Sequence, residues 1–210
     1  MQERSVGPRP REAWALSDGS ALTGESLGGR LLVVSGPGGV GKGTVVAELA
    51  RRRPELTVSV SATTRPPRDA EIAGQHYHFL TDEQFDDLIK SGGFLEWAEF
   101  NGRRYGTPWS SISDALAVGK PVVLEIDIQG ARQVREVFAG AVLVFLAPPS
   151  PEALEERLRG RGDTPGDIER RLEIARWEQA QSDDFDHVVV NDELDETVRA
   201  VSRILDGEPV

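Results

Sequence analysis

The sequence predicts an α/β fold in which a parallel sheet is flanked by helices. Short apolar runs typical of buried strands alternate with amphipathic helical patterns along most of the chain. The first apolar run, residues 31–35, passes directly into a glycine-rich turn and then into a helical pattern. At 210 residues the chain is long enough for one such domain with smaller lobes attached.

The glycine-rich turn at residues 36–44 indicates a phosphate site. It fits the pattern G-x-x-x-x-G-K-[ST] except that Gly43 stands where a hydroxyl residue belongs. Glycines let backbone N–H groups approach phosphates, the helix N-terminus adds partial positive charge, and Lys42 can reach the outer phosphates. A glycine-rich turn without a ligand is the alternative. The order of strand, loop, lysine and helix favours a nucleoside triphosphate site.

Composition narrows the class of protein. The net charge of −11 argues against non-specific nucleic-acid binding, which needs a basic face. The chain has no cysteine, so disulfides and thiolate metal sites are excluded, and a cytoplasmic location is compatible. No apolar run approaches the length of a membrane span, so we expect no membrane partner. Residues 1–29, rich in Gly, Ser, Pro and charge, predict a flexible N-terminal tail.

The first elements after the loop include a pair of arginines. We expect a helix that ends near Arg53, before Pro54, and then an alternating strand at residues 56–61. In the segment that follows, prolines 66 and 67 hold the chain extended around Arg65 and Arg68. Two arginines on a stiff loop suit a phosphate dianion, although solvated surface arginines are the alternative.

A helix and a hairpin come next. Residues 81–84 form a capping box for a helix that ends at the two glycines 92 and 93. Residues 94–100 predict a strand, with a turn at 101–102 and a return strand through 105–107. Glu96 lies within the aromatic-rich strand. If it is buried its carboxylate needs a partner, and the sequence alone leaves open whether it faces water instead.

The second half of the chain repeats the strand–helix alternation. A helix is expected from Pro108 to about residue 118, and an apolar strand at 121–127 carries Glu125 and Asp127 at its end. Carboxylates at the carboxyl end of a parallel strand beside a phosphate loop are where such folds hold Mg²⁺ or its waters. A helix follows residues 129–130, and another buried strand spans 141–147.

The last elements carry a cluster of arginines. Helices are expected at 151–160 and 168–181, with arginines on both sides of the turn at 161–166. This cluster is typical of either a solvated helix pair or a mobile lid for phosphates. A strand at 185–190 and an amphipathic helix at 194–204 complete the domain.

Several motifs together resemble those of a known family. They are the segments 36–44, 61–68, 71–77, 95–100, 105–107, 125–130, 161–162, 170–172 and 190–192. The chain from about residue 31 to 204 resembles the guanylate kinases, which transfer the γ-phosphoryl group of ATP to GMP.

The resemblance implies a P-loop kinase fold with three parts. The parallel-sheet core would comprise residues 30–60, 114–154 and 172–205. A GMP-binding lobe would span 61–113 and a small lid 155–171, so that the whole domain covers 30–205. The implied substrates are ATP and GMP with Mg²⁺ as cofactor, with no nucleic-acid partner; the sequence leaves the oligomeric state open.

The resemblance also implies roles for individual residues. Those that would bind ATP are Gly36, Pro37, Gly38, Gly39, Val40, Gly41, Lys42, Gly43, Thr44 and Asn191. Those that would bind GMP are Ser61, Arg65, Arg68, Glu71, Tyr77, Glu96, Tyr105, Thr107, Glu125 and Asp127. Catalysis would depend on Lys42, Arg161 and Arg171. Mg²⁺ would bind through waters near Gly43, Thr44 and Asp127.

Within the GMP set, the two arginines and two tyrosines would hold the phosphate, and Glu96 would accept hydrogen bonds from guanine N1 and N2. Ser61 and Thr107 would donate to the base or orient it. Adenine lacks this pair of donors, so AMP should be rejected.

Two departures from the family pattern are visible. Gly43 replaces the usual serine, in a Lys-Gly-Thr run that resembles adenylate kinases, and the spacing from Arg161 to Arg171 is one residue short. Two other functions remain open: a kinase of another phosphorylated acceptor, such as a ribose bisphosphate or another nucleotide, and a non-catalytic guanylate-kinase-like binding module.

Overall fold

The core is a five-stranded sheet in which every neighbouring pair of strands is parallel. The structure, a computed structural model, describes residues 14–15, 21–22, 29–100, 102–160 and 164–209. The strand order is β11 (His187–Val190), β10 (Val142–Ala147), β3 (Leu31–Ser35), β9 (Val122–Glu125) and β4 (Thr57–Val58). The central strand β3 is therefore the one that leads into the phosphate loop.

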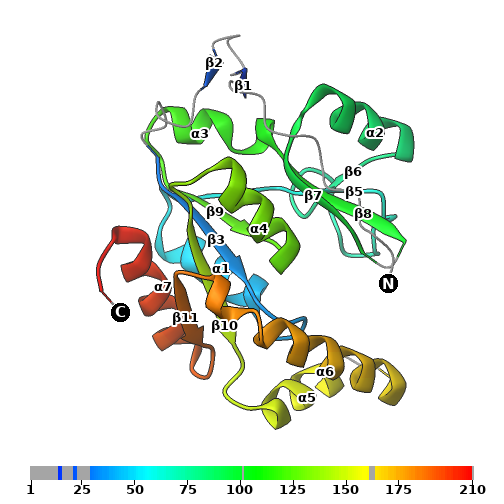
Figure 1. The fold of residues 1–210 in the computed structure, drawn as a ribbon, viewed down its shortest axis with the longest axis vertical. Coiled ribbons are helices and arrows are strands. Elements are labelled where there is room, and N and C mark those ends of the chain that lie inside the picture. The colour runs from blue at the N-terminus through cyan, green and yellow to red at the C-terminus, as the bar shows by residue number, and fades with distance from the viewer. Residues whose placement is uncertain (1–13, 16–20, 23–28, 101, 161–163, 210) are drawn as a thin grey trace.

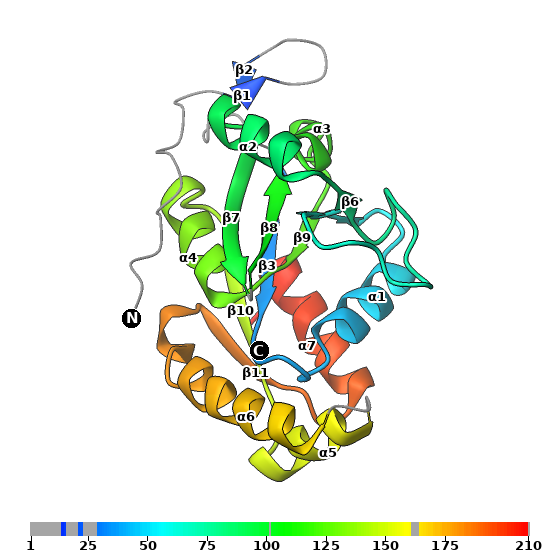
Figure 2. The ribbon, with the colours of Figure 1, turned by 90° about the vertical axis from the view of Figure 1, so that its right-hand side faces the viewer.

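Helices cover both faces of this sheet (Figure 2). On one face α1 (Lys42–Arg52) and α7 (Leu194–Asp206) pack on alternate side chains of β3 and β10, among them Leu32, Val34 and Leu146. On the other face α4 (Ile128–Val137) packs on the remaining set, including Leu31, Val33 and Phe145. The predicted parallel sheet flanked by helices is confirmed.

A second, mixed sheet forms the segment that follows β4. Its order is β6 (His78–Phe79), β5 (Ala62–Thr63), β8 (Arg103–Pro108) and β7 (Phe94–Phe100). Helix α2 (Asp82–Ser91) begins with the capping box expected from Thr81 and Gln84, and it ends at Gly92, whose φ of 67° is left-handed. The hairpin β7–β8 matches the strands that the sequence predicts.

The second sheet is joined to the core rather than separate from it. Leu95 of β7 and Trp109, which follows β8, lie in the same buried cluster as β3, β9 and α4. In Figure 1 this sheet with α2 lies at one end of the long axis, and α5 (Pro151–Gly160) and α6 (Pro165–Gln179) lie at the other. The phosphate loop lies between these two extensions.

Two elements differ from the sequence prediction. The strand expected at 56–61 is confined to β4, because it is an edge strand and the chain then crosses to β5 in the second sheet. The helix expected from Pro108 is divided into a 3₁₀ turn (Trp109–Ser111) and α3 (Ser113–Ala117). Trp109 N–H donates to Gly93 O, which ties this turn to the residue that precedes β7.

Three short elements complete the description. Another 3₁₀ turn, Ser182–Asp184, follows α6. In the predicted N-terminal tail, β1 (Trp14–Ala15) pairs antiparallel with β2 (Ala21–Leu22), and most of that range lies outside the described residues. In the part of the chain that the structure describes, no helix is long and apolar enough to span a membrane.

A substitution at Gly36 tests how closely the phosphate loop packs against the sheet. Its φ is 138°, and an added Cβ would lie 2.3 Å from Leu146 O of β10. Gly36→Ala should therefore lower the free energy of unfolding by about 1–3 kcal/mol or more, measured by urea denaturation. Gly38→Ala is the matched control, because a Cβ there meets nothing within 4 Å and its change should stay within about 0.5 kcal/mol. Equal stability of the two variants would contradict this account.

Candidate active site

The phosphate loop is shaped by glycines with left-handed backbone conformations. Gly39 has a φ of 98° and Gly41 a φ of 103°. A Cβ on Gly39 would lie 2.7 Å from the Leu158 side chain of α5, and one on Gly41 would lie 2.8 Å from Nδ2 of Asn191. The loop therefore packs directly against the first helix of the predicted lid and against the end of β11.

Protein donors hold the carbonyl groups of this loop. Lys42 Nζ donates to Gly36 O at 2.6 Å and to Pro37 O at 3.2 Å. Val40 O accepts from Asn191 Nδ2 at 2.7 Å and from Arg157 Nη1 at 3.0 Å. These bonds fix the shape of the loop where it leads into the N-terminus of α1, the kind of site at which phosphates bind in proteins.

Two residues at the loop therefore have a structural role that the sequence pattern did not indicate. Asn191, predicted at the ATP site, is buried and ties β11 to the loop. Arg157 was visible only as one member of the arginine cluster. Its second donor, Nη2, bonds Asn191 O at 2.8 Å, so α5, β11 and the loop are linked by one side chain.

Two carboxylates lie next to the loop at the end of β9. Glu125 pairs in register with Val34 of β3, and its Oε2 lies 3.2 Å from the point where a Cβ on Gly43 would be. The Glu125 carboxylate thus reaches the space beside Gly43, where the motif usually places a hydroxyl. Asp127 caps α4 and accepts from Gly130 N at 2.8 Å. These are hard oxygen ligands of the kind that Mg²⁺ prefers.

Glu96 is buried at the other half of the site. The residue is 5% exposed, and its Oε1 accepts from the Thr107 hydroxyl at 2.7 Å. Burial raises the pKa of Glu96 to about 7; the Thr107 hydrogen bond opposes this rise, whereas the charge of Asp127 adds to it. The question that the sequence left open is answered: Glu96 faces the interior.

A β-bulge explains why Glu96 turns inward. The β7–β8 register shifts between Phe94 and Glu96, so Leu95 is an extra residue without a partner on β8. Phe94 and Trp97 pack against Phe85 of α2, whereas Leu95 enters the core cluster and Glu96 lies against Gly130 of α4. Two successive side chains thus face the core, which strict strand alternation would forbid.

The residues of the lobe that are predicted to bind phosphate lie around Arg65. Its guanidinium makes a bidentate pair with Glu71, at 2.7 and 2.9 Å, and its Cζ lies 5.5 Å from the centre of the Tyr77 ring. Glu71 Oε2 also accepts from Arg68 N at 2.8 Å. Hydrogen bonds from Arg65, then from the Arg68 backbone, lower the pKa of Glu71 to about 2. Glu71 is therefore ionised at neutral pH and holds both arginine segments.

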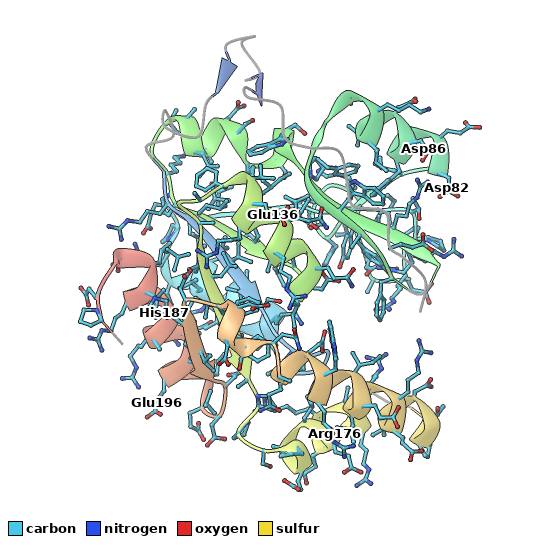
Figure 3. All side chains as sticks on the ribbon, in the orientation of Figure 1. Asp82, Asp86, Glu136, Arg176, His187 and Glu196 are labelled. Carbon is cyan, nitrogen blue, oxygen red and sulfur yellow. The ribbon has the colours of Figure 1, made fainter. Side chains whose placement is uncertain are left out.

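The two tyrosines lie side by side, Tyr77 directly before β6 and Tyr105 in β8. Their rings are 6.2 Å apart in an edge-on arrangement. Burial, with a contribution from the Glu125 charge, raises the pKa of Tyr77, which indicates that this residue lies near the core carboxylates. Tyr105 alternates on β8 with Arg104, which pairs on the outer side with Asp82 and Asp86 of α2, labelled in Figure 3.

The remaining predicted residues are placed as follows. Thr44 is exposed in the first turn of α1, and Arg171 is exposed on α6. Ser61 directly precedes β5, and its carbonyl accepts from His78 N at 2.8 Å. Arg161 lies outside the described residues. In the described part of the chain no cluster of three or more acidic or histidine residues could hold a metal ion by itself.

One further carboxylate near the loop was not anticipated. Burial raises the pKa of Glu178 on α6, while Lys42 and a backbone hydrogen bond from Gly38 oppose the rise. Glu178 therefore lies within the electrostatic reach of the phosphate loop. Nothing in the sequence pattern distinguishes it from the other acidic residues of α6.

This combination of a phosphate loop and a separate lobe with a buried carboxylate can be compared with known proteins. A family profile described as guanylate kinase matches residues 28–208. The chain belongs to the guanylate kinase family. The family membership confirms the resemblance noted in the sequence and the prediction of an ATP:GMP phosphotransferase.

Individual relatives agree with the family assignment. Guanylate kinase from Gloeobacter violaceus is 56% identical over 177 residues, covering 84% of this chain and 86% of the relative. Guanylate kinase from Streptomyces coelicolor is 54% identical over 171 residues, covering 81% and 87%. The crystal structure of guanylate kinase from Anaplasma phagocytophilum matches with a TM-score of 0.70 at 33% identity, covering 87% of this chain and 86% of that one.

Glu96 predicts a pH dependence for this guanylate kinase. Only the ionised carboxylate accepts two hydrogen bonds from guanine, and the pKa of Glu96 is raised to about 7. We therefore expect kcat/KM for GMP to fall about tenfold from pH 8 to pH 6, as Glu96 becomes protonated. The GMP phosphate also titrates, near pH 6. The Glu96→Gln variant isolates that component, and identical profiles for the two proteins would contradict the prediction.

Glu71 predicts an effect on GMP affinity. In Glu71→Gln the acceptor for Arg68 N–H is kept, but the ionic partner of Arg65 is lost. We expect KM for GMP to rise about three- to tenfold with kcat within about twofold, because the guanidinium is no longer fixed. Glu48→Gln is the matched control, since Glu48 also has a pKa near 2 and pairs with two arginines, on α1. A lower KM in Glu71→Gln would show that Glu71 only neutralises charge.

Proposed function

We propose that this chain transfers the γ-phosphoryl group of ATP directly to the phosphate of GMP, with the residues assigned above in those roles. In the reaction an oxygen of the GMP phosphate forms a bond to the γ-phosphorus as the bond to the β-phosphate bridging oxygen breaks. The products are ADP and GDP. Such transfer needs positioning and charge neutralisation more than covalent participation by the protein.

The observation that carries the choice of GMP is the buried Glu96–Thr107 pair. A buried carboxylate with one oxygen bonded to Thr107 has acceptor capacity that matches the N1 and N2 hydrogens of guanine. Adenine would place an acceptor, N1, against this carboxylate. Buried polar groups left unpaired are costly, so the same site would reject AMP.

At the phosphate end, Arg65, Arg68 and the tyrosines Tyr77 and Tyr105 would bind the phosphate of GMP. Arginine's planar fork suits phosphate oxygens, and the aromatic rings beside Arg65 restrict its movement. Glu71 would position the arginines rather than touch the phosphate, because two anions would repel each other.

At the ATP end, the loop from Gly36 to Thr44 would bind the phosphates, and Lys42 would exchange its carbonyl partners for phosphate oxygens. Arg161 and Arg171 would approach from the lid. Asn191 would contact the adenine end while it continues to hold the loop.

The donors present fit Mg²⁺. Glu125 supplies oxygens beside Gly43, and Asp127 supplies a carboxylate at the start of α4; together with Gly43 and Thr44 these residues would hold the ion through its waters. Mg²⁺ would neutralise charge that develops on the transferred phosphoryl group. We further infer a cytoplasmic location, which the substrates and the absence of cysteine fit, and we expect no nucleic-acid or membrane partner.

ADP production from ATP and Mg²⁺ tests this proposal, with GMP, dGMP, AMP, UMP or no acceptor in parallel. We expect strong turnover with GMP and turnover with AMP near background, since the buried carboxylate selects guanine. Lys42→Ala is the control: transfer should fall by at least about a hundredfold while GMP binding, measured by calorimetry, is kept.

Other outcomes would overturn the proposal. Faster turnover with a different phosphorylated acceptor would assign the chain to a related kinase. GMP binding without turnover with any acceptor would instead indicate a binding module.

A further inference from the structure

Helix α4 contacts the open edge of the second sheet beside Glu96. In the order β6-β5-β8-β7, β7 is an edge strand, so alternate backbone groups on its outer side have no strand partner. At Trp97 both of these groups are occupied by one side chain. Trp97 N donates to Gln133 Oε1 at 3.2 Å, and Gln133 Nε2 donates to Trp97 O at 2.9 Å.

Gln133 thus takes the place of a neighbouring strand for one residue. The primary amide offers one acceptor and one donor, which is the pair that an extended backbone residue requires. Gln133 is fixed from the core side, because Ala131 and Val134 of the same helix are buried against the parallel sheet. The two bonds therefore set the distance between a core helix and the edge of the lobe.

That distance defines the space in which Glu96 lies. A Cβ built on Gly130, one turn before Gln133, would lie 2.6 Å from Glu96 Oε2. The carboxylate thus lies directly against the helix backbone, with no room for a methyl group. On its other side Thr107 bonds Oε1. If β7 moved relative to α4, Glu96 Oε2 would move with it, away from its place against Gly130.

We propose that Gln133 is a positioning residue for Glu96, and that this helix-to-edge clamp helps to set the preference for guanine. The inference rests on the proposed function, in which Glu96 binds the guanine N1 and N2 hydrogens. Gln133 does not touch the nucleotide in this scheme. Gln133 acts by holding the backbone of Trp97, the residue that follows Glu96. The effect of removing Gln133 therefore passes through Glu96.

The test compares variants in steady-state assays with GMP and with inosine monophosphate, whose base lacks the 2-amino donor. Gln133→Met keeps the length of the side chain and removes both hydrogen bonds. We expect KM for GMP to rise about tenfold with kcat within about twofold, and the preference for GMP over inosine monophosphate to fall by a similar factor. Gln133→Ala should act in the same direction.

Gln84→Ala is the matched control for loss of stability. Gln84 also holds a backbone group of the lobe, since its Oε1 accepts from Thr81 N at 2.9 Å, but it lies at the start of α2. This variant should lower the melting temperature without changing the ratio of the two acceptors. A general loosening of the lobe would instead change the ratio equally in both variants, and that result would overturn the proposal.

A double-mutant cycle separates this inference from the function on which it rests. If Glu96 is the target, Gln133→Met should have little further effect on base preference in a Glu96→Gln protein. Additive effects would overturn the role of Gln133 while leaving that of Glu96 intact. A Glu96→Gln variant with unchanged base preference would instead overturn the assignment of Glu96 itself.

Discussion

The buried carboxylate of Glu96 is the constraint around which the second sheet is built. An ionised group removed from water is tolerated only with partners, and here Thr107 donates to Oε1, whereas Oε2 lies against Gly130 of α4. The pKa of Glu96 is raised because the hydrogen bond from Thr107 does not fully compensate for the loss of water around the carboxylate. In the proposed function the remaining acceptor capacity would bind the guanine base, so a local cost in folding free energy would serve recognition of the ligand.

The phosphate loop follows the opposite principle. Lys42, Asn191 and Arg157 all donate to its carbonyl groups, and the bonds from Asn191 and Arg157 to Val40 O fix part of its shape before a ligand arrives. Rigid preorganisation suits a site that binds the common phosphate chain of a nucleotide, where position matters more than selectivity. In the proposed function the lobe, with its ionic pair and its buried acid, would distinguish one acceptor from another.

The sequence predicted the elements whose causes are local. The loop, the capping box at Thr81 and the β7–β8 hairpin each depend on residues within a few positions of one another, and they appear as expected. The inward orientation of Glu96 depends on a bulge, which alternation along a single strand does not reveal. The contacts of Arg157 and Gln133 join residues from 34 to 117 positions apart, so only the folded chain shows them.

The shared packing of Leu95 and Trp109 with β3, β9 and α4 has a consequence for the folding of the molecule. A lobe with its own apolar interior could unfold, or be removed, independently of the parallel-sheet core. This lobe has two anchoring side chains inside the cluster that also supports the central strand, so removing it would take buried apolar contacts away from one face of the parallel sheet. We therefore expect loss of lobe structure and loss of core structure to be coupled, and a ligand bound to either half to stabilise both.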